Sequence, residues 1–159
     1  MAGKGSEHTI NGKRFNGEIQ LVHRRSKYSS TVSALNEPDS LAIVSIGQPH
    51  PELNKLCLIL NHVQQKGLLK DINTLKISIE NFLPKSKRYF SFSSSLTSPP
   101  LSECVKWLVF KEPVEVSRQQ ISVMRGLYQS KPEEDEDPIQ NNCRPIQPLE
   151  SKTINIFDS

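Results

Sequence analysis

Residues 95–110 read SLTSPPLSECVKWLVF, and this stretch decides the fold more than any other part of the chain. Its proline pair interrupts regular structure, because proline has no backbone N–H to give to a helix or sheet. From Cys104 to Phe110 the chain is rich in β-branched and aromatic residues, which is typical of a strand. We therefore predict a strand over this run. The serine-rich run around residues 91–98 and the 11 prolines of the chain indicate loops and strand breaks.

Two stretches upstream also have the pattern of strands. In residues 18–23 (EIQLVH) successive side chains alternate between faces, so Gln20 and Val22 share a face with Glu18. Residues 41–46 (LAIVSI) form a nearly continuous apolar run, which favours a strand that is buried on both faces.

Two helices are predicted. The first begins at Pro51, which suits the first helical turn, and its apolar spacing ends at Gly67. The second begins at Ser117, which forms a capping box with Gln120, and its apolar stripe consists of Ile121, Met124 and Leu127. A short strand is expected at residues 114–116, and the tail segments 144–149 and 153–157 are expected to be extended. The architecture is thus a mixed α+β, strand-rich fold with a few surface helices.

The composition limits the classes of function. A net charge of +3 over 159 residues is too small to indicate a nucleic-acid or membrane partner by charge alone. No apolar run is long enough to span a bilayer, and the polar first residues do not resemble a signal peptide. The three cysteines stand far apart and are odd in number, so we expect neither a disulfide framework nor a zinc ribbon, and we expect a cytoplasmic location.

Local catalytic motifs are not found. The sequence has no GxSxG elbow and no phosphate-binding loop. Its four histidines, at positions 8, 23, 50 and 62, do not stand in HxH, HxxxH or HExxH spacing. We therefore expect each histidine to lie on the surface or to be hydrogen-bonded in a structural role.

Several segments nevertheless resemble the α-type carbonic anhydrases, in the order and at nearly the spacing of that family. These segments are 5–10 (GSEHTI), 17–23 (GEIQLVH), 41–46 (LAIVSI), 95–107 (SLTSPPLSECVKW) and 142–149 (NCRPIQPL). The resemblance runs from about residue 5 to the end of the chain. It implies part of a large, mostly antiparallel sheet, and a single incomplete domain over residues 1–159 that lacks the amino-terminal part of the family domain.

The resemblance also implies where zinc is held in the family. Three histidines bind the ion there, and two of them form an HxH pair upstream of the GSEH segment. The position of the third histidine corresponds to Gln20, and a neutral amide is a poor zinc ligand beside imidazole. We therefore expect no metal site and no cofactor in this chain, although the family uses zinc.

The remaining pocket residues of the family have counterparts in this chain. Thr97 and Glu7 match the pair that orients zinc-bound hydroxide. Glu18 matches the carboxylate that orients the third histidine, a partner that we expect it to have lost. The apolar wall for carbon dioxide corresponds to Val22, Ile43, Leu96, Val105 and Trp107. Without a metal, we expect all of these residues to have structural roles.

Three functions follow from these observations. The leading hypothesis is a non-enzyme, either an acatalytic carbonic-anhydrase-related protein or a truncated product, which binds a protein partner. An exposed sheet edge and apolar face then favour association. The alternative is an active, zinc-dependent carbonic anhydrase that hydrates carbon dioxide reversibly, if the native chain is longer. A third possibility is polyanion binding through the basic residues at positions 24, 25 and 27.

Overall fold

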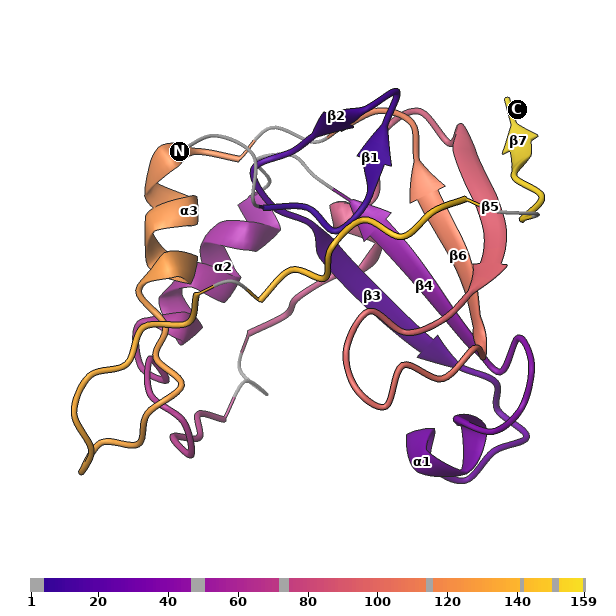
Figure 1. Cartoon of the computed structure of the whole chain (residues 1–159). Coiled ribbons are helices and arrows are strands. Elements are labelled where there is room, and N and C mark those ends of the chain that lie inside the picture. Colours follow the sequence, from indigo (N-terminus) through magenta and orange to yellow (C-terminus); the bar gives the residue numbers. More distant parts are fainter. Residues whose placement is uncertain are drawn as a thin grey trace. The chain divides into compact units, whose positions relative to one another are not determined.

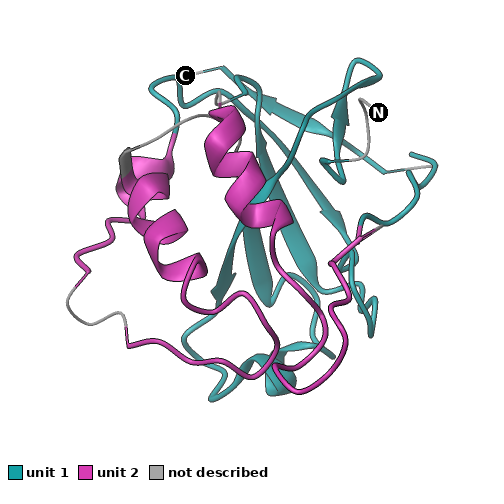
Figure 2. Cartoon of the chain, turned by 90° about the vertical axis from the view of Figure 1, so that its left-hand side faces the viewer, with its two compact units in different colours: residues 1–47, 84–113, 143–159 teal, residues 48–83, 114–142 magenta. Residues whose placement is uncertain are grey.

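The computed structural model describes residues 5–46, 51–71, 75–113, 116–140, 142–149 and 152–158. The chain divides into two compact units, which Figure 2 colours separately. The first unit comprises residues 1–47, 84–113 and 143–159, and the second comprises residues 48–83 and 114–142. Each unit is described by itself below, and the single domain over residues 1–159 stays a prediction.

A five-stranded twisted sheet forms the first unit (Figure 1). Its strand order is β3-β4-β6-β5-β7, in which only the β4–β6 pair is parallel and the other three pairs are antiparallel. The strands are β3 (Ile19–Arg24), β4 (Leu41–Ile46), β5 (Tyr89–Ser94), β6 (Val105–Phe110) and β7 (Asn155–Phe157). The strand-rich fold class predicted from the sequence is therefore confirmed.

The register of the sheet places the site residues on one face. Val22 lies opposite Ile43 across the β3–β4 pair, and Ile43 lies beside Trp107 across the β4–β6 pair. Trp107 in turn lies opposite Phe92 of β5. Because directly paired residues share a face and side chains alternate along a strand, Gln20 lies on this face too. We call it the Trp107 face.

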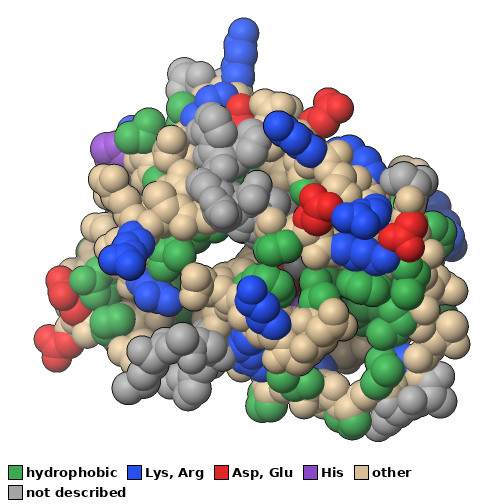
Figure 3. Space-filling model, turned by 90° about the horizontal axis from the view of Figure 1, so that it is seen from above, with side chains coloured by type: hydrophobic (Ala, Val, Ile, Leu, Met, Phe, Trp, Pro, Cys, Tyr) green, Lys and Arg blue, Asp and Glu red, His purple; other side chains and the backbone are tan. Residues whose placement is uncertain are grey.

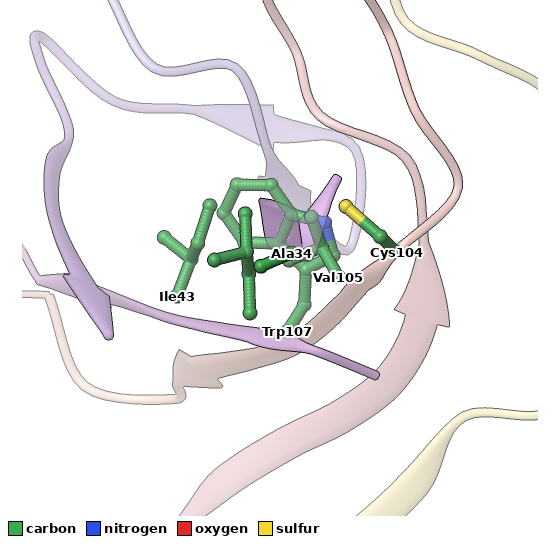
Figure 4. Close-up of a cluster of buried hydrophobic side chains, with 6 residues drawn as sticks. Ala34, Ile43, Cys104, Val105 and Trp107 are labelled. Carbon is green, nitrogen blue, oxygen red and sulfur yellow. The ribbon is translucent and has the colours of Figure 1, made fainter. Parts of the chain in front are cut away.

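The core of the first unit is packed against this face. Figure 4 shows the buried cluster, in which Ile43, Val105 and Trp107 come from neighbouring strands and Cys104 precedes β6. Ala34 joins them from the short helix α1 (Thr31–Ala34), which begins with a capping box between Ser30 and Ser33. Phe92 and Leu96 are partly buried against the same cluster. The Trp107 indole N–H donates to the Ser95 carbonyl at 3.1 Å, so the buried ring leaves no polar atom unpaired.

A small hairpin precedes the sheet. Strands β1 (Thr9–Ile10) and β2 (Lys13–Arg14) pair antiparallel around Asn11 and Gly12, both of which have positive φ. Positive φ at both central residues is the requirement of a tight hairpin turn, and Asn-Gly satisfies it at low cost. The hairpin brings the chain back so that residues 7 and 8 lie beside the start of β3.

Two helices and a single 3₁₀ turn make up the regular structure described in the second unit. These are α2 (Pro51–Leu60), η1 (Glu80–Phe82) and α3 (Arg118–Arg125). The predicted capping box is confirmed, because the Ser117 hydroxyl accepts from the Gln120 N–H and the Gln120 side chain accepts from the Ser117 N–H. Within the described part of the chain, neither helix is long and apolar enough to cross a membrane.

Three expectations about these elements need correction. Helix α2 ends at Leu60 rather than near Gly67, because the hydrogen bonds from the His62 and Val63 N–H groups close i→i−3 turns. Helix α3 ends at Arg125, so Leu127 lies beyond it. The serine-rich run does not begin as a loop, because β5 extends through residue 94 with phenylalanines on one face.

The tail was expected to be extended, and part of it is. Residues 155–157 form strand β7, and residues 144–149 run as a stretched trace without helix or strand (Figure 1). The short strand expected at residues 114–116 falls mainly on residues 114 and 115, which lie outside the described residues.

Truncation of Ile43 to alanine is expected to destabilise the first unit by about 2–5 kcal/mol, because the side chain is fully buried and its loss leaves a cavity. Urea unfolding followed by the fluorescence of Trp107, the single tryptophan, measures this change. Val32→Ala is the matched control, because Val32 lies on the surface of α1 and is expected to change stability by less than about 0.5 kcal/mol. Equal effects of the two substitutions would contradict the described core.

Candidate functional site

The predicted site residues Glu7, Glu18 and Gln20 lie in contact with one another in the first unit. Glu7 precedes β1, Glu18 stands immediately before β3, and Gln20 is the second residue of β3. The β1–β2 hairpin positions Glu7 beside β3, since the chain reverses between the two segments. Sequence alternation placed Glu18 and Gln20 on one side of the strand, and their hydrogen bond confirms it.

The Glu18 carboxylate is the centre of this cluster. It accepts from the backbone N–H groups of Glu7 (3.1 Å) and His8 (2.9 Å) through Oε2. Its Oε1 lies 2.9 Å from His8 Nδ1 and accepts from Gln20 Nε2 at 3.0 Å. A carboxylate has about four lone-pair sites, so all the hydrogen-bonding capacity of Glu18 is used.

These contacts keep Glu18 ionised. Burial alone would raise the pKa of the carboxyl, but the hydrogen bond and charge of His8, together with the hydrogen bond from Gln20, lower the pKa to about 2. The Glu18 side chain is 5% exposed, so its interactions are little screened by water. A buried carboxylate with this pKa is negatively charged at any physiological pH.

His8 is held between this carboxylate and the aromatic floor of the sheet. Its ring meets Trp107 edge-on at a centroid distance of 4.5 Å and Phe92 at 5.7 Å. The Nδ1 atom faces Glu18, which favours a proton on that nitrogen. The expectation that His8 is a hydrogen-bonded structural histidine is therefore confirmed.

The side-chain amide of Gln20 spans two carboxylates. Its Nε2 donates to Glu7 Oε2 at 2.8 Å and to Glu18 Oε1 at 3.0 Å. Two acceptor oxygens require the NH₂ end of the amide, because the amide oxygen there would face two negative groups. The orientation of the Gln20 amide is thus dictated by its neighbours. The histidine partner that the resemblance implies for Glu18 is absent, and Gln20 donates to Glu18 from the same position instead.

Thr97 and Glu7 line the same cavity, together with Trp107 and Arg144. Among the described residues, however, the Thr97 hydroxyl and the Glu7 carboxylate make no hydrogen bond with each other. Glu7 instead accepts from Gln20 through Oε2 and from the Arg144 backbone N–H at 3.3 Å through Oε1. The hydroxide-orienting role of the pair stays a prediction.

The residues of the predicted apolar wall differ in their exposure. Ile43, Val105 and Trp107 are buried in the core cluster, and Leu96 packs against that cluster from the loop after β5. Val22 is 55% exposed, although its register places it on the same face. The predicted wall residues therefore belong to the core, except for Val22, whose side chain is largely exposed.

Two contributors to the site were not singled out from the sequence. His8 stands beside Glu7 in the GSEH segment, but its pairing with Glu18 depends on the hairpin that folds between them. Arg144 donates from Nη1 to Ser95 Oγ (3.0 Å) and to the Leu96 carbonyl (3.3 Å). It thereby ties the carboxyl-terminal segment to the loop that carries Thr97. The only sequence signal for Arg144 was its place in the NCRPIQPL segment.

The site does not fit a zinc ion. The one lone-pair donor that Gln20 can offer a metal is its amide oxygen, and such oxygens suit magnesium, calcium and manganese better than zinc. Within the part of the chain that the structure describes, no group of three or more His, Cys, Asp or Glu side chains is arranged to hold a metal ion. The basic residues at positions 24, 25 and 27 lie exposed and apart from this cluster in the sequence.

Comparison with known proteins identifies the relatives of the chain. A family model described as eukaryotic-type carbonic anhydrase matches residues 1–157. Carbonic anhydrase 1 of Mus musculus is 39% identical over 155 residues, which cover 94% of this chain and 59% of the relative. Carbonic anhydrase 7 of Homo sapiens is 37% identical over 155 residues, with 94% and 58% covered. The chain thus spans less than two thirds of the length of these relatives.

Replacement of Glu18 by glutamine is expected to remove up to about 3 kcal/mol of stability at pH 7, because a pKa lowered from 4.5 to about 2 is worth about 1.4 kcal/mol per unit. A lowered pKa stabilises the fold above pH 4.5, and this contribution is lost as the pH falls toward 2. Urea unfolding at a series of pH values measures the loss.

The wild-type chain should lose stability steeply between pH 4.5 and about 2, and Glu18→Gln should show a flatter profile. Glu37→Gln serves as the control, because Glu37 is exposed and should leave the profile unchanged. Identical profiles for Glu18→Gln and the wild type would show that the buried pair does not contribute.

Proposed function

Because the chain belongs to the eukaryotic-type carbonic anhydrase family, we propose that it is a carbonic-anhydrase-related protein that does not hydrate carbon dioxide. In this proposal the protein acts by contact with another polypeptide. The observation that supports it is the engagement of the Gln20 amide by Glu7 and Glu18, at the position that the family resemblance assigns to a zinc-binding histidine.

The chemistry of that position explains the proposed loss of activity. Imidazole offers zinc a nitrogen lone pair, whereas an amide nitrogen has none to offer and an amide oxygen is a weak zinc donor. When bound, zinc would supply an ionised water for attack on carbon dioxide. Glu7, Glu18 and Gln20 instead satisfy one another, so they hold their geometry without needing a metal.

The free cysteines support a reducing location for the protein. Cys57, Cys104 and Cys143 are all thiols in the structure, and the first two are buried. Burial raises the pKa of the Cys57 thiol, so that it stays protonated and unreactive. Three cysteines that form no disulfide suit the cytoplasm, which is the location we propose.

The purified protein is expected to contain far less than one zinc per chain and to show no hydration of carbon dioxide above the uncatalysed rate. Metal analysis after dialysis against zinc, together with stopped-flow hydration assays, measures both quantities. One tightly held zinc per chain with inhibitor-sensitive activity would overturn the proposal in favour of an active enzyme.

A second experiment tests the role of Gln20 directly. A chimera is made by joining the chain to the part of mouse carbonic anhydrase 1 that precedes the matched segment. In this chimera Gln20→His is expected to raise zinc affinity by more than the ~10–100-fold effect of an outer-shell partner. Gln20→Asn is the matched control and should not raise it. Equal zinc affinity for the chimera with Gln20 and the chimera with histidine would show that Gln20 is not what prevents zinc binding.

A further inference from the structure

The segment around strand β2 contains two Asn-Gly pairs, Asn11-Gly12 before the strand and Asn16-Gly17 after it. Asparagine is a thermolabile residue, and its side-chain amide is lost most easily when glycine follows. The reason is that glycine has no Cβ to hinder its backbone nitrogen from reaching the asparagine side chain. Because the local chemistry of the two pairs is the same, their surroundings determine which one reacts first.

Asn11 and Gly12 form the tip of the β1–β2 hairpin. Both residues are exposed, and a Cβ at Gly12 would have no atom beyond its chain neighbours within 4 Å. Figure 1 shows the turn between β1 and β2 at the top of the view, and Figure 3 looks down on this side, where charged and polar side chains are common at the surface. Among the described residues, none therefore packs over Gly12.

The Asn16-Gly17 pair is held more firmly. Gly5 lies so close to this peptide group that a Cβ at Gly5 would collide with the Asn16 carbonyl. The preceding residue is also fixed, because the Phe15 N–H donates to Ser6 Oγ at 2.9 Å and the Phe15 carbonyl accepts from the Ser6 N–H at 3.0 Å. Ser6 is buried, so these bonds are sheltered from water. Rotation of the Asn16 backbone is therefore restricted.

Attack by the glycine nitrogen requires the asparagine backbone to leave its native conformation. Asn11 has a φ of 51° and Gly12 a φ of 75°, the left-handed pair that closes the two-residue turn. The sheet that holds this turn consists only of β1 and β2, with two residues in each strand. A two-stranded hairpin is marginally stable by itself, so its local opening costs little free energy. The hairpin tip therefore opens more readily than the Asn16-Gly17 segment.

We propose that Asn11 is a site of spontaneous covalent modification, at which the side-chain amide is lost and the peptide link to Gly12 is transferred to the side chain. The Gly12 nitrogen loses its proton to solvent and attacks Asn11 Cγ. A bond forms between this nitrogen and Cγ, the bond from Cγ to Nδ2 breaks, and Nδ2 takes up a proton and leaves as ammonia. The product is a cyclic imide, and nothing is oxidised or reduced.

Water then opens the imide in one of two ways. Addition of water to the main-chain carbonyl carbon of residue 11 breaks its bond to the Gly12 nitrogen. The chain then continues through Cγ, which is an isoaspartyl linkage with a free α-carboxylate. Addition of water at Cγ gives ordinary aspartate instead. In both cases one water enters and one ammonia leaves, so the residue gains a negative charge.

The isoaspartyl product does not fit the native turn. Its Cβ becomes part of the main chain, so the turn gains one backbone atom and loses the geometry of a two-residue hairpin. This turn pairs β1 with β2 and brings the Glu7 and His8 N–H groups to the Glu18 carboxylate. Modification of the exposed Asn11 is therefore expected to weaken the buried polar cluster.

The test incubates the purified 159-residue chain in mildly alkaline buffer at physiological temperature and follows both Asn-Gly pairs by peptide mapping. Mass spectrometry with electron-transfer fragmentation separates asparagine, aspartate and isoaspartate, and labelling by an isoaspartyl methyltransferase measures isoaspartate independently. In the folded chain we expect Asn11 to react at least about fivefold faster than Asn16, because the hairpin opens locally. In urea the two rates should become similar, since the unfolded pairs have the same chemistry.

Asn11→Gly is the diagnostic variant, because glycine accepts positive φ and keeps the turn but has no amide to lose. Asn16→Gln is the matched control, because it removes the other Asn-Gly pair and leaves the hairpin tip unchanged. After incubation the wild type and Asn16→Gln should contain isoaspartate at position 11, and hydrogen exchange at the His8 amide should be faster in the modified molecules. Asn11→Gly should keep slow exchange at His8.

Equal rates at Asn11 and Asn16 in the folded chain, or reaction of Asn11 in urea alone, would overturn the proposed site. Unchanged His8 exchange in molecules that carry the isoaspartyl linkage would overturn its coupling to the polar cluster.

Discussion

The first unit depends on a buried negative charge that must be surrounded by donors. An ionised carboxylate removed from water costs several kcal/mol unless hydrogen bonds and a counter-charge replace its hydration. Glu18 meets this requirement with two backbone N–H groups, an imidazole and an amide. Each donor belongs either to the segment before β1 or to β3, so satisfying the charge also fixes how these two parts of the chain meet.

This constraint reaches further than its immediate contacts. His8 is oriented by Glu18 and in turn packs edge-on against Trp107, which is the largest fully buried side chain of the core. Glu7 accepts from Gln20 on one side and from the Arg144 backbone on the other. The carboxyl-terminal segment, the hairpin and the sheet are therefore connected by one polar cluster that lies on the Trp107 face. A substitution of Gln20 therefore directly alters the hydrogen bonds of Glu7 and Glu18.

Sequence reasoning succeeded where the physical signal was local. The alternation in residues 18–23, the apolar run of residues 41–46 and the capping box at Ser117 each depend on neighbours in the chain, and each corresponds to an observed element. Sequence reasoning failed where contacts between distant parts of the chain determine the structure. Serines at positions 91 and 93 have low strand propensity, but β5 is held between β6 and β7 by two ladders of backbone hydrogen bonds. The partners of Glu18 were missed for the same reason, since the hairpin that brings His8 to it is a long-range feature.

The Trp107 face combines a polar surface around Glu18 with an apolar surface toward β5 and β7. Around Glu18 the polar groups satisfy one another, so this half of the face requires no ligand to be stable. Toward β5 and β7 the same face is apolar, and Phe90, Phe92, Trp107 and Val109 line a cavity of about 630 Å³ there. The Trp107 face therefore joins a polar cluster whose members satisfy one another to a continuous apolar surface.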